Sequence, residues 1–155
     1  MADVKPIPEG YHSVTPYLCV KGGAEAIDYY KKAFNAVELF RMEHDGKIGH
    51  AEIKIGDSPI MLADEHPEIG AVSPQTLGGT ATSIMIYVDD VDKIFKQAIE
   101  AGGLEKRPVQ DQFYGDRSGM LTDPFGHVWS VATHKEDVSP EEMDRRMAAA
   151  KASGA

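Results

Sequence analysis

The sequence contains a single cysteine and no long hydrophobic run, and each absence excludes a class of protein. Cys19 stands alone among 155 residues, which excludes an internal disulfide and a zinc site built from several cysteines. The longest apolar runs, such as 84–88, are far shorter than the ~20 residues that a membrane-spanning helix needs. The opening segment 1–6 lacks the apolar stretch of a secretory signal. We therefore expect a protein of the reducing cytoplasm that has no membrane partner.

Basic residues are also scarce, because 16 Lys and Arg stand against 25 Asp and Glu and give a formal charge of −9. Proteins that bind nucleic acids neutralise phosphates with clustered Lys and Arg, and this sequence has no such cluster. The length suits one domain, 1–155, with its own hydrophobic core. These features favour a small-molecule ligand and exclude nucleic acid as a partner.

One pattern of strands and a helix occurs twice, at the offset that separates Val20 from Val88, 88 − 20 = 68 residues. In each half an apolar run predicts a strand, a 3.6-residue apolar period predicts a helix, and three more runs predict strands. The expected elements are strand 14–20, helix 24–35 and strands 36–43, 47–56 and 59–64, then strand 82–88, helix 91–101 and strands 104–109, 117–123 and 128–134.

The duplication predicts an α+β fold in which two tandem βαβββ units form a cupped mixed sheet with flanking helices. Unit one covers about 11–65 and unit two about 81–134, and a connector rich in Gly and Pro covers about 66–80. Ser139 as N-cap, Pro140 after it and Glu142 three residues beyond the cap predict a final helix over about 139–150.

Four phrases of the sequence match a known family: Thr15-Pro16-Tyr17-Leu18, Gly49-His50-Ala51-Glu52, Asp123-Pro124-Phe125-Gly126-His127-Val128-Trp129-Ser130 and Glu136-Asp137-Val138-Ser139-Pro140-Glu141-Glu142. With these phrases the chain resembles the vicinal oxygen chelate superfamily, which includes glyoxalase I, bleomycin-resistance proteins and extradiol dioxygenases. Within it, the chain is similar to the PhnB-like branch, often labelled 3-demethylubiquinone-9 3-methyltransferase-like. The resemblance implies that each unit curls its sheet into a cup and that two cups face each other around a pocket.

The resemblance also implies where a catalytic metal would bind. Enzymes of the superfamily hold a divalent ion through one residue in the first strand and one in the last strand of each unit. Those positions fall here on Thr15, Met61 (or Leu62 in a shifted register), Ser83 and Ser130. Hydroxyls and a thioether are poor ligands for such ions, which prefer carboxylates and imidazoles. We therefore expect no metal and no other cofactor, and a polar, uncharged pocket floor.

His50 and Glu52 lie two residues apart on a predicted strand and so point to one face. They are interpreted either as pocket groups that bind a ligand, exchange protons or form half of an unconventional metal site, or as part of a solvated strand face. Tyr17 is a further pocket candidate that could stack on a ligand. Gln112, Tyr114 and Arg117 form either a pocket rim or an ordinary surface loop.

Three further residues receive structural interpretations. Trp129 alternates with Ser130 and is expected to pack against the helices, His127 to belong to a turn, and Cys19 to be buried as a small apolar residue.

These residues are consistent with two functions and disfavour a third. The first is a protein that binds a small molecule between its two units without a metal. The alternative is a metal-dependent lyase or dioxygenase of glyoxalase type with an atypical site around His50 and Glu52. A methyltransferase is disfavoured because no Gly-rich cofactor fingerprint follows a strand. No catalytic residue is assigned. A homodimer is expected, because related proteins cover the edge strands of such sheets by pairing.

Overall fold

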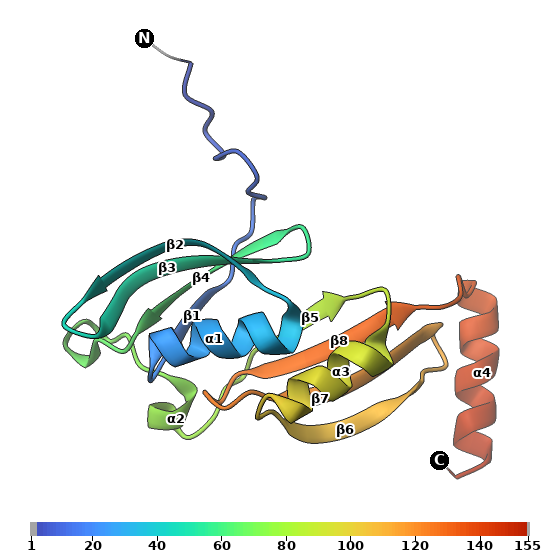
Figure 1. The fold of residues 1–155 in the computed structure, drawn as a ribbon. Helices are drawn as coiled ribbons and strands as arrows, with labels where there is room; N and C mark the ends of the chain where they lie inside the picture. Colours follow the sequence, from blue (N-terminus) through green and yellow to red (C-terminus); the bar gives the residue numbers. More distant parts are fainter. Residues whose placement is uncertain (1–2, 155) are drawn as a thin grey trace.

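The computed structural model describes residues 3–154, and it consists of two βαβββ units that lie side by side (Figure 1). Unit one contains β1 (Tyr17–Val20), α1 (Gly23–Phe34), β2 (Val37–His44), β3 (Lys47–Ile55) and β4 (Ser58–Asp64). Unit two contains β5 (Ser83–Tyr87), α3 (Val91–Glu100), β6 (Leu104–Asp111), β7 (Asp116–Thr122) and β8 (Val128–His134). The connector forms η1 (Pro67–Ile69) and α2 (Pro74–Leu77), and α4 (Pro140–Ala152) ends the fold. The predicted duplication and α+β class are confirmed.

Each unit forms its own four-stranded mixed sheet. The strand orders are β1-β4-β3-β2 and β5-β8-β7-β6, in which the first strand of each unit pairs in parallel with the last and the other pairs are antiparallel. Helices α1 and α3 cover the same side of the two sheets, and they pack against each other (Figure 1). The two cups therefore do not face each other within one chain, and no helix formed by residues 3–154 covers the opposite face of either sheet.

Helix α1 begins at a pair of glycines that the end of β4 holds in place. The Asp64 carboxylate accepts the N–H groups of Gly22 and Gly23 at 2.8 and 3.0 Å, and that of Ile48 at 2.8 Å. Gly22 has φ +92, and a Cβ on Gly23 would lie 2.7 Å from the Ile48 side chain, so both positions require glycine. In unit two the Thr133 hydroxyl has the corresponding role at the start of α3, because it accepts the Val91 N–H at 2.9 Å.

A buried carboxylate joins the two units. Asp123, in the turn after β7, is only 3% exposed. It accepts the Tyr30 hydroxyl of α1 at 2.6 Å and the Trp129 indole N–H of β8 at 2.8 Å. It also accepts the backbone N–H groups of Phe125 and His127 at 2.9 and 3.0 Å. Trp129 thus packs on the helix side of its sheet, as its alternation with Ser130 predicts.

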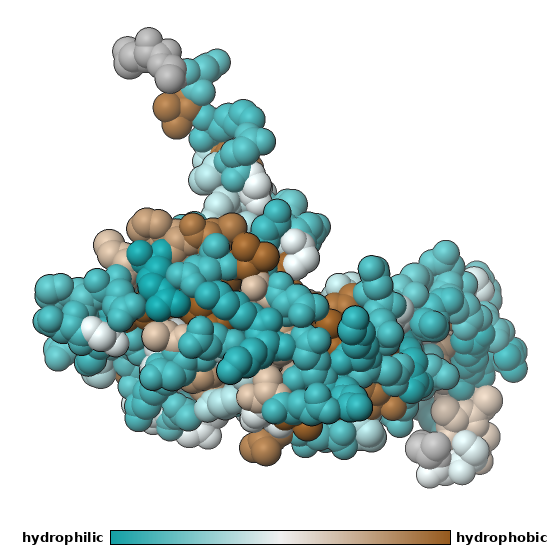
Figure 2. Space-filling model, in the orientation of Figure 1, coloured by the Kyte–Doolittle hydropathy of each residue, from teal (hydrophilic) through white to brown (hydrophobic). Residues whose placement is uncertain are grey.

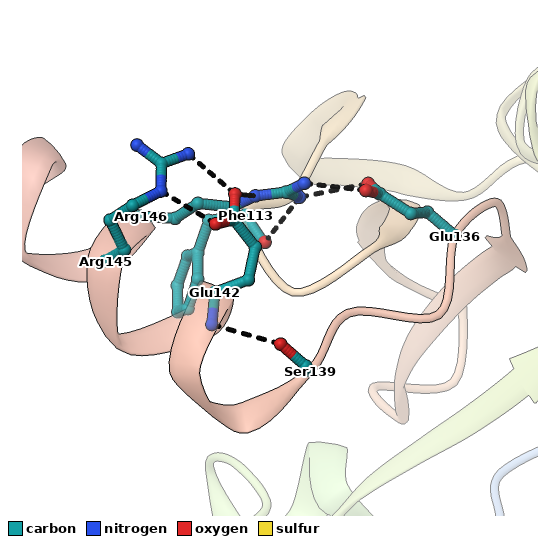
Figure 3. Close-up of polar contacts among 6 residues, drawn as sticks. All are labelled: Phe113, Glu136, Ser139, Glu142, Arg145 and Arg146. Carbon is teal, nitrogen blue, oxygen red and sulfur yellow. Dashed lines mark hydrogen bonds and ion pairs between the residues drawn. The ribbon is translucent and has the colours of Figure 1, made fainter.

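Helix α4 is anchored at its first turns (Figure 3). The Ser139 hydroxyl accepts the Glu142 N–H at 3.2 Å, which is the predicted N-cap. The Glu142 carboxylate bonds to Arg145 and Arg146 rather than back to the cap. Arg146 also reaches Glu136 at 2.6 Å and the Phe113 carbonyl at 3.2 Å, so the helix is tied to the β6–β7 hairpin. None of the helices formed by residues 3–154 is long and apolar enough to cross a membrane.

Replacing Asp123 with Ala is expected to destabilise the protein by at least about 3 kcal/mol. The substitution leaves the Tyr30 hydroxyl, the Trp129 N–H and two backbone N–H groups without their acceptor, and each buried unsatisfied group costs about 1–3 kcal/mol. Urea unfolding followed by Trp129 fluorescence measures the change. Asp57→Ala, at the exposed β3–β4 turn, is the matched control and is expected to change stability by less than about 0.5 kcal/mol. Equal stability of the two variants would contradict the assigned role of Asp123.

Candidate functional site

A chain of hydrogen-bonded polar side chains lies on the uncovered face of the sheet of unit one. The Tyr17 hydroxyl of β1 lies 2.8 Å from Nδ1 of His50, and Nε2 of His50 lies 3.2 Å from Oε1 of Glu52. The Tyr11 hydroxyl, from the segment before β1, donates to the other oxygen of Glu52. The sequence predicts that His50 and Glu52 share a face, but no pattern in it indicates Tyr11.

The alternation and register of the strands place this chain. In β3 the side chains of Ala51, Ile53 and Ile55 are buried under α1, so His50 and Glu52 point to the opposite face. Across the sheet, Met61 is the register partner of both Tyr17 and Glu52, while Phe40 lies opposite Glu52 and Met42 opposite His50. The polar chain is therefore surrounded by three apolar side chains.

The surroundings of this row of polar side chains keep the carboxylate of Glu52 charged and the phenols of Tyr11 and Tyr17 neutral. The hydrogen bond from Tyr11, followed by that from His50, holds the pKa of Glu52 below its usual value. Burial and the contact with Glu52 raise the pKa of Tyr11 to about 12. Burial also raises the pKa of Tyr17, with smaller contributions from Cys19 and Glu52. At neutral pH both tyrosines are therefore hydrogen-bond donors.

A hollow of about 320 Å³ lies between the two units, next to this chain. Its walls come from β1, from α2 and the end of the connector, from β5 and from the start of β8: Pro16, Tyr17, Leu18, Cys19, Val72, Pro74, Leu77, Gly79, Thr80, Thr82, Ile84, His127 and Val128. Beside it, Nε2 of His127 lies 2.9 Å from the Cys19 carbonyl and links the two units. The connector contributes much of this wall, although its sequence predicts only a linker.

Cys19 departs from its predicted position. Leu18 and Val20 are buried under α1, so alternation turns Cys19 to the other side of β1, where it is half-buried and lines the hollow. Burial, followed by Glu65 and Asp64, raises the pKa of its thiol, which disfavours the reactive thiolate.

The three predicted rim residues lie at the far end of unit two. Gln112 and Tyr114 are in the β6–β7 hairpin, close to the contact between Phe113 and α4. Arg117 lies on the helix side of the sheet, where it pairs with Asp92 at 2.8 Å and with Asp111 at 3.2 Å. These ion pairs explain its position, and none of the three residues lines the hollow.

A second polar cluster lies on the uncovered face of unit two. The buried carboxylate of Asp116 accepts the Tyr87 hydroxyl at 2.9 Å and bonds to Nδ1 of His134 at 2.7 Å. Nε2 of His134 lies 2.8 Å from Asp137. These two carboxylates, Asp116 first, raise the pKa of His134. No pattern in the sequence indicates this cluster.

The residues at the superfamily's metal positions do not fit a divalent ion. Met61 and Ser130 are half-buried on the uncovered faces of their sheets, Ser83 starts β5, and Thr15 precedes β1. All four offer neutral donors. Both ring nitrogens of His50 already have hydrogen-bond partners, and residues 3–154 contain no group of three or more His, Cys, Asp or Glu side chains that could hold a metal.

Comparison with known proteins identifies the family. The sequence profile of the Glyoxalase/Bleomycin resistance protein/Dioxygenase superfamily matches residues 10–131, which span both units. The chain therefore belongs to this superfamily, as the resemblance of its motifs implies.

Several relatives match most of the chain. The Mycobacterium tuberculosis protein Rv0887c is 40% identical over 139 residues, which cover 87% of this chain and 82% of that protein. The crystal structure of TioX from Micromonospora sp. ML1 matches with a TM-score of 0.63 at 25% identity, covering 79% of this chain and 98% of TioX. A PhnB protein from Bacillus cereus matches with a TM-score of 0.60 at 20% identity, covering 79% of this chain and 99% of that protein. The solved structures that share the fold thus include a PhnB protein.

We expect the purified protein to bind no stoichiometric nickel, zinc, iron or manganese, because its four metal positions carry neutral side chains. Added metal should leave the Tm unchanged, and the methylglyoxal–glutathione adduct should not be turned over. Elemental analysis of protein prepared without a histidine tag measures the first expectation. One equivalent of a tightly bound ion, lost in His50→Ala but retained in the exposed control His44→Ala, would show this to be wrong.

Proposed function

We propose that this protein binds a small, largely apolar molecule in the hollow between its two units, without a divalent metal. The observation that carries the proposal is the hollow itself. Its volume lies at the lower end of the range for ligand sites, about 300–1,000 Å³. Apolar walls from Val72, Leu77, Ile84 and Val128 surround a few polar groups, which is the composition typical of such sites.

The polar groups around the hollow suit a ligand with one or two hydrogen-bonding atoms. Tyr17, Thr80, Thr82 and His127 contribute hydroxyls and an imidazole, and none of them carries a fixed charge. A neutral or weakly acidic molecule therefore fits better than a strongly charged one. The superfamily's name includes resistance to bleomycin, which is consistent with a small-molecule role.

Filling the hollow should abolish binding of an apolar probe. Thr82 lines the hollow and its side chain is exposed, so Thr82→Trp places an indole there with little cost to the core. We expect the uncharged dye N-phenyl-1-naphthylamine to gain fluorescence with the wild-type protein and to lose at least about tenfold in affinity in Thr82→Trp. Ala81→Trp is the matched control, because Ala81 is the exposed neighbour that does not line the hollow. Equal binding by both variants would contradict the proposed site.

We further propose that two copies of the chain associate through the uncovered sheet faces. Phe40 and Met42 on unit one and Met85 and Tyr87 on unit two are each 43–62% exposed. Figure 2 shows apolar side chains gathered over β2, close to the base of the N-terminal segment. Contiguous apolar areas are uncommon on monomeric proteins, and β2 is also an unpaired sheet edge. A second copy would cover both.

Light scattering at micromolar concentration should give about 34 kDa, which is twice the chain mass of 16.9 kDa. Charges on the proposed interface, in Phe40→Lys combined with Met42→Lys, should reduce this value to that of the monomer, because Lys is costly to bury. Ile69→Lys serves as control, since Ile69 is 75% exposed in the connector, away from the sheet faces. A wild-type mass of about 17 kDa would exclude the dimer.

A further inference from the structure

Tyr17 belongs both to the hollow and to the polar chain of unit one. Tyr17 is one of the residues that line the hollow, and its hydroxyl lies 2.8 Å from Nδ1 of His50. Tyr11, His50 and Glu52 do not line the hollow. Within this chain of side chains, Tyr17 is therefore the member placed to touch a bound molecule, and the other three act through it.

Glu52 determines which ring nitrogen of His50 carries the proton. An ionised carboxylate can only accept hydrogen bonds, and its Oε1 lies 3.2 Å from Nε2 of His50. Nε2 must then carry the proton and donate it, which leaves Nδ1 as an acceptor for the Tyr17 hydroxyl. Tyr11 donates to the second carboxylate oxygen, so Glu52 is held in place from both sides.

We propose that Tyr17, His50 and Glu52 form a proton relay that removes a proton from a molecule bound in the hollow. The proposal rests on the ligand site proposed above. The proposed substrate class is a small molecule with an acidic O–H group. The relay needs no metal, because the protein's own side chains accept the proton and stabilise the resulting charge.

The proton moves in two coupled transfers. A lone pair of the Tyr17 oxygen takes the proton of the bound molecule, and the proton of Tyr17 passes to Nδ1 of His50. The products are the anion of the bound molecule, a neutral Tyr17 and a His50 imidazolium, whose charge Glu52 stabilises. As in a Ser-His-Asp triad, the histidine takes the proton of a hydroxyl and the carboxylate orients the ring, but here the phenol oxygen accepts a proton instead of attacking as a nucleophile. Tyr17 is thus the catalytic residue, and Glu52 is a positioning residue.

The Glu52 carboxylate favours the charged product, because it lies 3.2 Å from Nε2 of the ring that becomes positively charged. Phe40, Met42 and Met61 flank the relay on the sheet face. Cys19, the next residue of β1 on this face, has a thiol whose pKa is raised, so it adds no negative charge at neutral pH. Lys54 follows Glu52 on the same face of β3.

The tautomer of His50 tests the relay without any ligand. Nitrogen-15 NMR of the histidine rings should show that the neutral ring of His50 carries its proton on Nε2 and none on Nδ1. Tyr17→Phe should shift the Nδ1 resonance of His50 by removing its donor, whereas His44→Gln, at the 93% exposed side chain of His44, should leave it unchanged. A proton on Nδ1 would overturn the relay, because no acceptor would remain for Tyr17.

Proton transfer itself can be measured with para-nitrophenol, a weakly acidic aromatic molecule whose anion absorbs visible light. At a pH just below its own ionisation, the bound probe should be largely the anion with the wild-type protein. Tyr17→Phe and His50→Gln should lower the ratio of bound anion to bound neutral probe at least about tenfold, which corresponds to one pKa unit. His44→Gln should keep the wild-type ratio.

Equilibrium dialysis of the same samples separates the two proposals. A probe that fails to bind the wild-type protein contradicts the hollow as a ligand site, while the His50 tautomer still decides the relay. A probe that binds but stays neutral, or that ionises equally in Tyr17→Phe, overturns the relay and leaves the ligand site standing.

Discussion

The buried carboxylate of Asp123 is the interaction on which the placement of the two units depends. Removing a carboxylate from water is costly unless its oxygens are paired, and Asp123 has four donors. One of them, the Tyr30 hydroxyl, comes from the other unit, so α1 must lie where Tyr30 reaches the β7–β8 turn. The contact between α1 and α3 follows, with the Tyr29 hydroxyl donating to the Ala98 carbonyl at 3.1 Å.

The position of the candidate site follows from that packing. With both helices on one side, the opposite sheet faces stay uncovered, and the edge strands β1 and β5 both contribute to the wall of the hollow between the units. The turn that contains Asp123 also places His127, whose ring bonds to the Cys19 carbonyl of unit one. The connector must then pass the hollow on its way from β4 to β5, and its α2 supplies the remaining wall.

Local patterns predicted the elements of this fold well and the contacts between them poorly. The 68-residue offset, the strand alternation that pairs His50 with Glu52 and the Ser139 cap are local features, and the structure contains all three. Asp123 shows both the success and the limit of local patterns. Asp followed by Pro and Gly predicts a turn, and Asp123 forms one by accepting the N–H groups of Phe125 and His127. Its bonds to Tyr30 and Trp129 span 93 and 6 residues, and only the first joins the units. The hydrogen bond from Tyr11 to Glu52 joins residues 41 positions apart in the sequence, so no local pattern predicts it either.

Each unit carries a tyrosine, a histidine and a carboxylate that are hydrogen-bonded in a row. The order of the three groups differs between the units, and this difference decides whether the tyrosine can pass its proton to the histidine. In unit one His50 stands between a tyrosine and a carboxylate, so its Nδ1 is free to take a proton from the tyrosine. In unit two the carboxylate of Asp116 stands between Tyr87 and His134, and both rings donate to it. The two ring nitrogens of His134 bond to Asp116 and Asp137, so Tyr87 has no direct hydrogen bond along which to pass its proton to this ring. The cluster of unit two therefore fixes the end of β8 and the segment that leads to α4, and of these two clusters only that of unit one has a tyrosine hydrogen-bonded directly to a histidine.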